Sequence, residues 1–247
     1  SGSFDPNLPY MTTSSFNNKK SSLRNALQKK KIIIFPHCYF DNPHRYRYMI
    51  FDDFYLQVKY FLELSKEFKN YEWFYKPHPN ELRSELNVHK NILSDYPNVT
   101  YLDKDVSHKD ILKLKPSCVI TNHGTLSHEY AYFKIPVINT GDNPHINYKF
   151  CLHLKFKKQI RKVIKNIDVY KKKIDFDKKE IYQYMYLHYH YFPNLNDENK
   201  LLNDNYFAFK DIKKNNTSEI FSKFIRQGKN VDNNIKMYVE KFINKNL

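Results

Sequence analysis

The sequence is poor in glycine, cysteine and long apolar runs, and each shortage excludes a class of protein. Only four of the 247 residues are glycine and three are cysteine. Three widely spaced cysteines form no disulfide framework, so we expect a reducing, cytoplasmic compartment. No apolar run approaches the ~20 residues that a transmembrane helix needs, and no signal peptide is visible. The GxxxxGK[ST], GxGxxG and GxSxG patterns are absent, which argues against P-loop NTPases, ordinary dehydrogenases and serine hydrolases.

Basic residues, in contrast, are abundant. Lysine and arginine number 41 against 26 acidic residues, which gives a formal net charge of +15. This charge suits nucleic acid, an anionic membrane surface or phosphorylated substrates. The basic clusters are separate, with the longest at residues 155–165, and no nucleic-acid-binding signature accompanies them. We therefore expect no nucleic acid partner, and either a solvated charged face or attraction to an anionic leaflet.

From residue 31 onward, short apolar strands alternate with helical patterns. Expected strands cover residues 32–35, 72–75, 99–102, 118–120 and 136–138, and expected helices cover 50–68, 82–93, 108–114 and the residues after 125. This alternation predicts an α/β fold, a Rossmann-like parallel sheet flanked by helices. Residues 1–30 are expected to form an N-terminal arm or linker, 31–150 the Rossmann-like domain, and 151–247 a basic, mainly helical extension. That extension includes a helix around Arg161 and closing helices within 218–247.

The stretch from Ser117 to His145 carries the strongest indication of a ligand site, because it holds two of the four glycines. Gly124 lies between a strand and a helix, and Gly141 follows the next strand. A glycine at such a turn lets backbone N–H groups approach a phosphate, and the helix N-terminus adds positive potential. The pattern predicts a nucleotide site, with a purely structural turn as the alternative.

A second candidate element, Lys76-Pro77-His78-Pro79, follows a strand directly. The two prolines fix the backbone around His78 and keep the loop from becoming helical. The imidazole and the Lys76 ammonium would then be presented at the strand end, where they could hold phosphate oxygens. A rigid turn with an incidental histidine is the alternative.

The loop after the first strand contains His37, Asp41 and His44. A His-Asp pair can orient a base, and an aspartate in a closed site can itself act as base or nucleophile. All three are metal-ligand types, but their spacing matches no closed metal site, so we expect no metal there. A polar loop of solvated histidines is the alternative.

Two further groups follow the glycine loops. Glu129 lies four residues after Thr125, where a carboxylate can take the hydroxyls of a ribose. Asn143 and His145 could close over a sugar, although the Gly-Asp-Asn-Pro sequence that starts at Gly141 is good turn chemistry in any protein.

Three segments together carry a family resemblance: FPHCYFDNPHRYRYMIFDDFY, WFYKPHPNE and CVITNHGTLSHEYAYFKIPVINTG. They resemble bacterial capsule and lipopolysaccharide glycosyltransferases of GT-B type, and most of all the nucleotide-binding half of cytidine-dependent enzymes such as Kdo transferases. The resemblance covers residues 30–150. It implies that His78 contacts the donor phosphate, that residues 121–125 cap it, that Glu129 holds the ribose and that Asp41 lies near the transferred sugar.

Motifs and resemblance together give one set of expected site residues. The donor-binding set is Lys76, His78, Thr121, Asn122, His123, Gly124, Thr125, Glu129 and Gly141, and the catalytic pair is Asp41 and His37. No cofactor and no metal are expected, because helix and basic groups would stabilise the departing phosphate.

The expected function is that of a cytoplasmic glycosyltransferase, or its donor-binding domain, peripheral on the inner face of the membrane. It would move a sugar such as Kdo from a cytidine nucleotide to a saccharide or lipid-linked acceptor of a bacterial surface polysaccharide. A CDP-glycerol or CDP-ribitol phosphotransferase, which shares a similar His-Pro element, is one alternative. A non-enzymatic basic module for an anionic polymer or membrane is the other. A complete GT-B enzyme has two Rossmann-like halves, and this chain has room for one.

Overall fold

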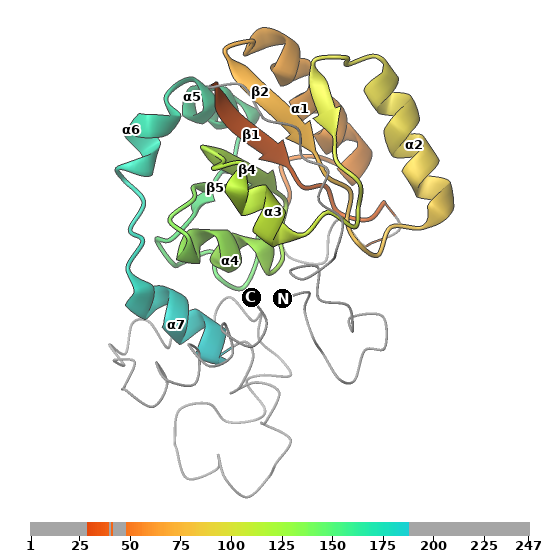
Figure 1. Cartoon of the computed structure of the whole chain (residues 1–247). Coiled ribbons are helices and arrows are strands. Elements are labelled where there is room, and N and C mark those ends of the chain that lie inside the picture. The colour runs from red at the N-terminus through yellow and green to blue at the C-terminus, as the bar shows by residue number, and fades with distance from the viewer. Residues whose placement is uncertain (1–28, 40, 42–47, 188–247) are drawn as a thin grey trace, which may run out of the picture.

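The computed structural model describes residues 29–39, 41 and 48–187. Within them, strands and helices alternate along the chain (Figure 1). The elements are β1 (Lys30–Ile34), α1 (Phe54–Glu67), β2 (Tyr71–Tyr75), α2 (Arg83–Ser94), β3 (Val99–Tyr101), α3 (His108–Lys113), β4 (Cys118–Thr121), α4 (Leu126–Tyr132), β5 (Val137–Asn139), β6 (Leu152–His153), α5 (Lys157–Lys165), α6 (Ile167–Lys171) and α7 (Lys178–Tyr186). Most of the expected N-terminal arm and the closing helices expected within 218–247 lie outside the described residues.

The strands form one parallel sheet in the order β3-β2-β1-β4-β5-β6. This confirms the α/β, Rossmann-like fold expected from the alternation. The strand order reverses between β1 and β4, where Ile33 pairs with Val119. In open parallel sheets, ligands bind outside the carboxyl ends of the strands at such a switch point. The loops after β1 and β4 are therefore the first place to look for a site.

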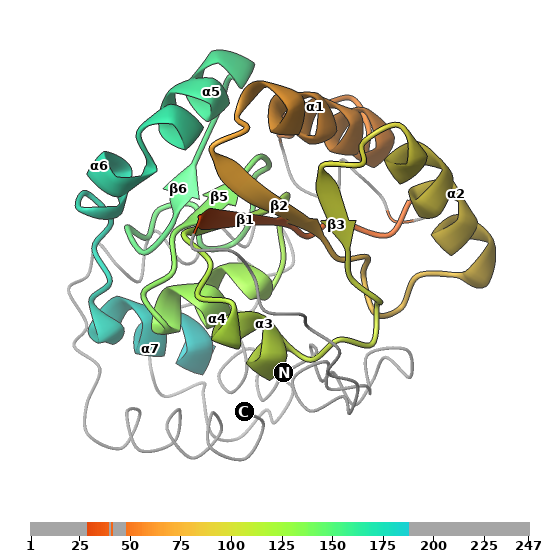
Figure 2. The ribbon, with the colours of Figure 1, turned by 45° about the horizontal axis from the view of Figure 1, so that its top comes forward.

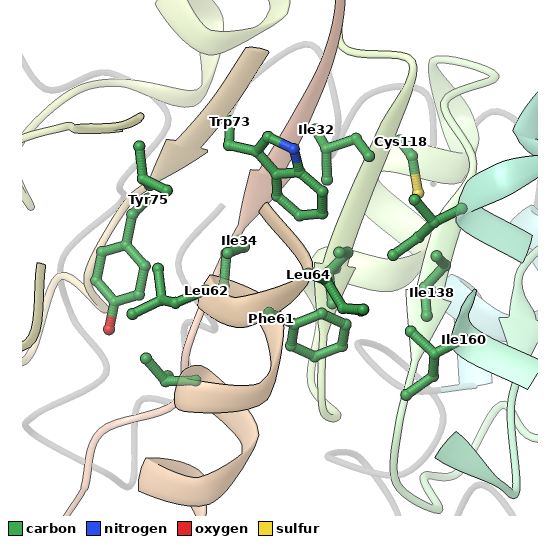
Figure 3. Close-up of a cluster of buried hydrophobic side chains, with 14 of the residues drawn as sticks. Ile32, Ile34, Phe61, Leu62, Leu64, Trp73, Tyr75, Cys118, Ile138 and Ile160 are labelled. Atoms are coloured by element: carbon green, nitrogen blue, oxygen red, sulfur yellow. The ribbon is translucent and has the colours of Figure 1, made fainter. Parts of the chain in front are cut away.

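Helices cover both faces of the sheet. Figure 2 shows α1, α2 and α5 on one face and α3, α4 and α7 on the other. Successive residues of a strand point to opposite faces, so Ile32 and Ile34 enter one core and Ile33 the other. Figure 3 shows the first core, in which Trp73 packs near residues of α1. Burial of each large apolar side chain contributes about 1.5–3 kcal/mol to the free energy of folding. The two cores therefore hold the strand ends in place.

The sequence of helix α1 explains where the helix begins and why it continues through Ser65. The Asp53 side chain accepts the N–H of Leu56 at 2.7 Å and caps the first turn. Phe54, Val58 and Phe61 follow at helical spacing and are buried. Ser65 interrupts this apolar stripe, yet it is buried and its hydroxyl donates to the Leu62 carbonyl at 2.6 Å. The helix therefore runs through Ser65 to Glu67.

Strand β6 is not predicted by the sequence, because two residues are too few to show an alternating pattern. It pairs in parallel with β5, with Leu152 opposite Ile138. Beyond it, α5 adds Ile160 to one core and α7 adds Ile181 to the other. The boundary expected at residue 150 therefore falls inside the connection between β5 and β6, and the sheet continues past it.

The basic segment after residue 154 forms an amphipathic helix, as expected around Arg161. The exposed side chains of α5 are Lys157, Lys158, Arg161, Lys162 and Lys165. None of the helices within the described part of the chain combines the length and apolar character that crossing a bilayer requires.

Candidate functional site

The loops after β1, β2 and β4 bring three histidine rings together at the carboxyl edge of the sheet. The ring centroids of His37 and His123 lie 4.0 Å apart with an interplanar angle of 25°, and those of His37 and His78 lie 6.1 Å apart at 13°. Phe54, the first residue of α1, stacks against His37 at 5.0 Å. We call His37, His78 and His123 the central histidine cluster. It forms because the switch point gathers loops that lie far apart in the sequence.

His37 holds Asp41 rather than offering a free nitrogen. Its Nδ1 lies 3.1 Å from Oδ2 of Asp41, and its Nε2 lies 3.1 Å from the carbonyl oxygen of His123. A carboxylate and a carbonyl both accept, so both bonds form together when each ring nitrogen carries a hydrogen. The Asp41 side chain is 47% exposed. The expected His-Asp pair is thus in contact, with the carboxylate on the open side.

His78 is a neutral hydrogen-bond donor with a fixed tautomer. Its Nδ1 accepts the backbone N–H of Asn80 at 3.2 Å and lies 3.1 Å from the Cys38 thiol. An accepting Nδ1 places the ring hydrogen on Nε2. Burial, reinforced by nearby His37 and Lys76, lowers the pKa of His78 to about 4. At neutral pH this side chain therefore offers one N–H and no charge.

Lys76 does not present its ammonium at the strand end, which corrects the expectation. The residue is 1% exposed, and Nζ donates to the carbonyls of Lys104 at 2.9 Å and Pro77 at 3.5 Å. Burial lowers the pKa of Lys76 to about 8, although Asp105 and Asp103 act in the opposite direction. Its charge lies inside the protein, tied to the loop after β3.

The loop after β4 has the backbone geometry expected of a close approach. Gly124 has a φ of +110°, a conformation that strains any residue with a side chain. A Cβ there would lie 3.8 Å from His37 Nε2, which is ordinary contact, so the backbone conformation and not crowding favours glycine. Thr125 precedes α4 but its side chain caps no N–H group. The first N–H groups of α4 also have no acceptor within the helix.

Asn122 connects the ends of β4 and β5. It is 1% exposed, its Oδ1 accepts from the Thr140 hydroxyl at 3.1 Å, and its Nδ2 lies 2.6 Å from His123 Nδ1. A Cβ at Gly141 would lie 2.6 Å from that Oδ1. Glycine is therefore required at position 141 by packing against Asn122. Thr121 is buried as well, so Thr121, Asn122 and Gly141 support the loop from within.

Glu129 lies in the first turn of α4 and is 7% exposed. Its backbone N–H donates to the Thr125 carbonyl at 3.3 Å, which places the two residues one turn apart.

Asn143 and His145 form a turn, in which the Asn143 side chain accepts the His145 N–H at 3.2 Å. Both are buried more deeply than Glu129, at 1% and 0% exposure. His44 lies outside the described residues.

A buried polar chain that the sequence does not reveal supports the central histidine cluster. The Tyr75 hydroxyl contacts His89 Nδ1, and His89 Nε2 lies 3.3 Å from a carboxylate oxygen of Glu81. The other Glu81 oxygen accepts the Tyr39 N–H at 3.4 Å. Burial raises the pKa of the Glu81 carboxyl, but His89 more than offsets this, so the pKa lies below its ordinary value. The chain fastens the loop after β2 to the loop after β1.

Comparisons with known proteins leave the family open. No protein-family model matches the chain, and no curated protein matches it. Among solved structures it is similar to a UDP-GlcNAc 2-epimerase from Neisseria meningitidis bound to UDP-GlcNAc, with 15% identity, a TM-score of 0.43 and coverage of 60% of this chain and 39% of that one. It is also similar to two structures of the wall teichoic acid polymerase TagF. One, soaked with CDPG, has 19% identity, a TM-score of 0.41 and coverage of 70% and 42%. The other has 16% identity, a TM-score of 0.38 and coverage of 70% and 44%. The chain thus spans about two fifths of the length of the solved structures it matches.

Proposed function

We propose that the protein binds a nucleotide-activated sugar at the central histidine cluster and transfers the sugar to a saccharide acceptor. One observation carries this proposal: three imidazoles from three separate loops meet at the switch point of a Rossmann-like sheet. Nucleotides bind at this place in folds of this kind. Gly124 allows a phosphate to approach the backbone at the same point.

In this proposal His78 and the start of α4 hold the donor phosphates. The Nε2–H of His78 donates to a phosphate oxygen, and the first N–H groups of α4 bind others. When the bond between sugar and phosphate breaks, the electron pair leaves with the nucleotide. N–H groups that already point at those oxygens stabilise the growing negative charge, and they need not reorganise as it forms. His37, through its second ring nitrogen, holds the backbone carbonyl of His123 and so positions this loop.

Asp41 is the proposed base. Its side chain is about half exposed and one oxygen is held by His37. It takes the proton of the acceptor hydroxyl as that oxygen forms its bond to the sugar. His37 orients the carboxylate, and Glu129 binds the ribose hydroxyls, as the family resemblance implies.

The family resemblance also suggests a cytidine nucleotide as donor, a Kdo-like sugar as the transferred group and a growing bacterial surface polysaccharide as acceptor. The exposed basic face of α5 supports a place at the inner surface of the membrane, because lysine and arginine near an anionic leaflet are each attracted by about 1 kcal/mol. A lipid-linked acceptor would be found there.

Calorimetric titration with CMP, CDP, UMP, UDP, GDP and ADP, with and without magnesium, tests the proposal. We expect a cytidine nucleotide to bind, and His78→Gln to weaken it at least about tenfold, or 1.4 kcal/mol. Glu129→Gln should also weaken binding, whereas Glu67→Gln, on the exposed side of α1, is the matched control. A preference for UDP or GDP would replace the cytidine assignment, and a folded protein that binds no nucleotide would contradict the proposal.

Donor exchange then separates sugar transfer from alditol-phosphate transfer. The purified chain would be incubated with CMP-Kdo or CDP-glycerol and an oligosaccharide acceptor. Sugar transfer breaks the bond between sugar and phosphate and leaves the acceptor product free of phosphorus. Alditol-phosphate transfer breaks the bond between the two phosphates and adds phosphorus to the product. We expect the first result.

A further inference from the structure

We propose that His145, Cys151 and His153 form a zinc site at the β5–β6 edge of the sheet. We call these residues the edge cluster. This site is independent of the proposed function, and a metal there departs from the expectation that the chain holds none. It uses His145, which the sequence offered only as a residue that could close over a sugar, together with Cys151 and His153.

The distances within the edge cluster suit one small ion. Cys151 Sγ lies 3.5 Å from His145 Nδ1 and 3.3 Å from His153 Nε2. All three ligand atoms lie within 4.8 Å of one another. Zinc bonds of about 2.3 Å to sulfur and about 2.0–2.1 Å to nitrogen, at tetrahedral angles, place sulfur and nitrogen about 3.5 Å apart. The two sulfur–nitrogen distances therefore match those that a bound ion would impose.

The chemistry of the three ligands favours zinc among the common ions. Imidazole nitrogen and thiolate sulfur both bind zinc, whereas magnesium and calcium take oxygen ligands. His145 is fully buried and Cys151 is 6% exposed, so these two ligands are shielded from competing water, whereas His153 is half-buried. Three protein ligands leave the fourth tetrahedral position to water or another small ligand.

Asn139 supplies an independent indication. It is fully buried, and its Oδ1 accepts from the Ser127 hydroxyl at 2.6 Å. Its Nδ2 has no acceptor among the described residues, although the amide interacts with the Cys151 side chain. A thiol sulfur is a weak acceptor, but coordination to zinc converts it to a thiolate, which accepts N–H groups well. Zinc at Cys151 would thus turn the weak sulfur acceptor that faces this buried amide into a strong one.

The position of the edge cluster indicates a structural role for the ion. The connection from β5 to β6 covers residues 140–151, all of them described, and contains no helix. Strand β6 has only two residues. His145 lies within this connection, Cys151 immediately precedes β6, and His153 ends it. One ion would fasten the irregular connection to the edge strand and hold the chain that continues from Gly141.

Metal analysis of the full chain, purified without chelators, tests the site. We expect about one equivalent of zinc. After the metal is stripped, cobalt should give the visible absorption of a tetrahedral ion together with a thiolate-to-cobalt charge-transfer band. Cys151→Ala should remove that band and weaken zinc binding more than about 100-fold, beyond the loss typical of an outer-shell change. Cys118→Ala, at a buried cysteine of β4, is the matched control and should keep both.

The wild-type chain alone can decide the outcome if Cys151→Ala fails to fold. A folded wild type that binds neither zinc nor cobalt would overturn the proposal, and the cluster would then be held by hydrogen bonds between thiol and imidazole. Cobalt binding without the thiolate band would overturn it as well, because Cys151 would not be a ligand. Binding of Cu(I) in place of zinc would overturn the assignment of the ion.

Discussion

Two groups of histidines lie beside one sheet, one at its switch point and one at its β6 end, and their partner atoms differ. In the central histidine cluster the ring nitrogens contact a carboxylate, a carbonyl, a backbone N–H, a thiol and a side-chain amide, and the rings stack. In the edge cluster two ring nitrogens converge with a sulfur within 4.8 Å of one another. The first arrangement leaves an N–H to donate to an anion, and the second gathers lone pairs around a cation. The surroundings, and not the residue type, decide what each group can bind.

The two clusters also differ in how they are supported. The central histidine cluster lies at the switch point and is held by the buried chain from Tyr75 through His89 to Glu81. The edge cluster lies where the sheet ends at a two-residue strand. Asn122 lies against Gly141, and the loop from Gly141 to His145 connects the two clusters. Changes on either side or in this loop should therefore separate the two clusters experimentally.

The largest effect is expected from His89→Ala, which breaks the support of the central histidine cluster alone. Glu81 and His89 have fully buried side chains, so the change leaves a carboxylate and the Tyr75 hydroxyl without their partner. Loss of one member of a buried pair costs about 3–5 kcal/mol, and urea unfolding should show that loss. Nucleotide affinity should fall while zinc content stays. A loss below about 1 kcal/mol would mean that the chain does not support the loop.

Gly141→Ala should disturb both clusters, because it lies between them. A Cβ at this position would lie 2.6 Å from Asn122 Oδ1, and the hydrogen bond that this oxygen accepts from the Thr140 hydroxyl keeps the Asn122 side chain from moving aside. Overpacking of this kind costs about 1–3 kcal/mol. Chemical denaturation measures the loss, and weaker binding of both nucleotide and zinc should accompany it. Unchanged stability would show that Asn122 can shift freely.

Lys76→Met should stabilise the protein at neutral pH. Burial lowers the pKa of Lys76 from 10.5 to about 8, so the folded state holds a disfavoured charge throughout the range below about pH 8. Removing it gains about 3 kcal/mol, less about 1 kcal/mol for the lost hydrogen bonds to carbonyls. The wild type loses this disadvantage as pH rises through 8 toward 10.5, so the difference in unfolding free energy should shrink there. An equal difference at both ends of that range would contradict the explanation.

The smallest effect concerns the pH dependence of folding. The folded protein keeps His78 neutral down to about pH 4, whereas an exposed histidine takes up a proton near 6.5. The unfolded state binds more protons in this window, so stability decreases as pH falls from 6.5 toward 4. His78 accounts for about 1 kcal/mol of that loss between roughly pH 6.5 and 5.5. Urea unfolding of His78→Gln at both pH values should show a loss smaller by that amount, and an identical loss would place His78 in a solvated setting.

The sequence predicts the fold better than it predicts the site. Strand and helix alternation is repeated several times along the chain, so single ambiguities such as Ser65 do not hide it. Strand β6 could not be predicted from the sequence, because its pairing with β5 and not its own composition makes it a strand. The loop positions of His37, His78 and Gly124 follow from the strand ends that precede them.

Side-chain directions at the site could not be predicted in the same way. Lys76 and His78 are two residues apart, yet one is directed into the protein and the other joins the central histidine cluster. The chain from Tyr75 to Glu81 and the edge cluster depend on contacts between loops. Only the packed fold brings such atoms together, and no residue spacing in the sequence predicts these contacts.

Nitrogen-proton NMR of the histidine side chains tests the central claim most directly. The full chain would be labelled at its 11 histidines, assigned with single variants, and titrated with CDP and separately with zinc. We predict that His78 is found as the Nε2–H tautomer and that CDP shifts its signals, whereas zinc shifts those of His145 and His153. Signals of all these residues moving with the same ligand, or CDP leaving the central histidine cluster unchanged, would contradict the assignment of an anion to one cluster and a cation to the other.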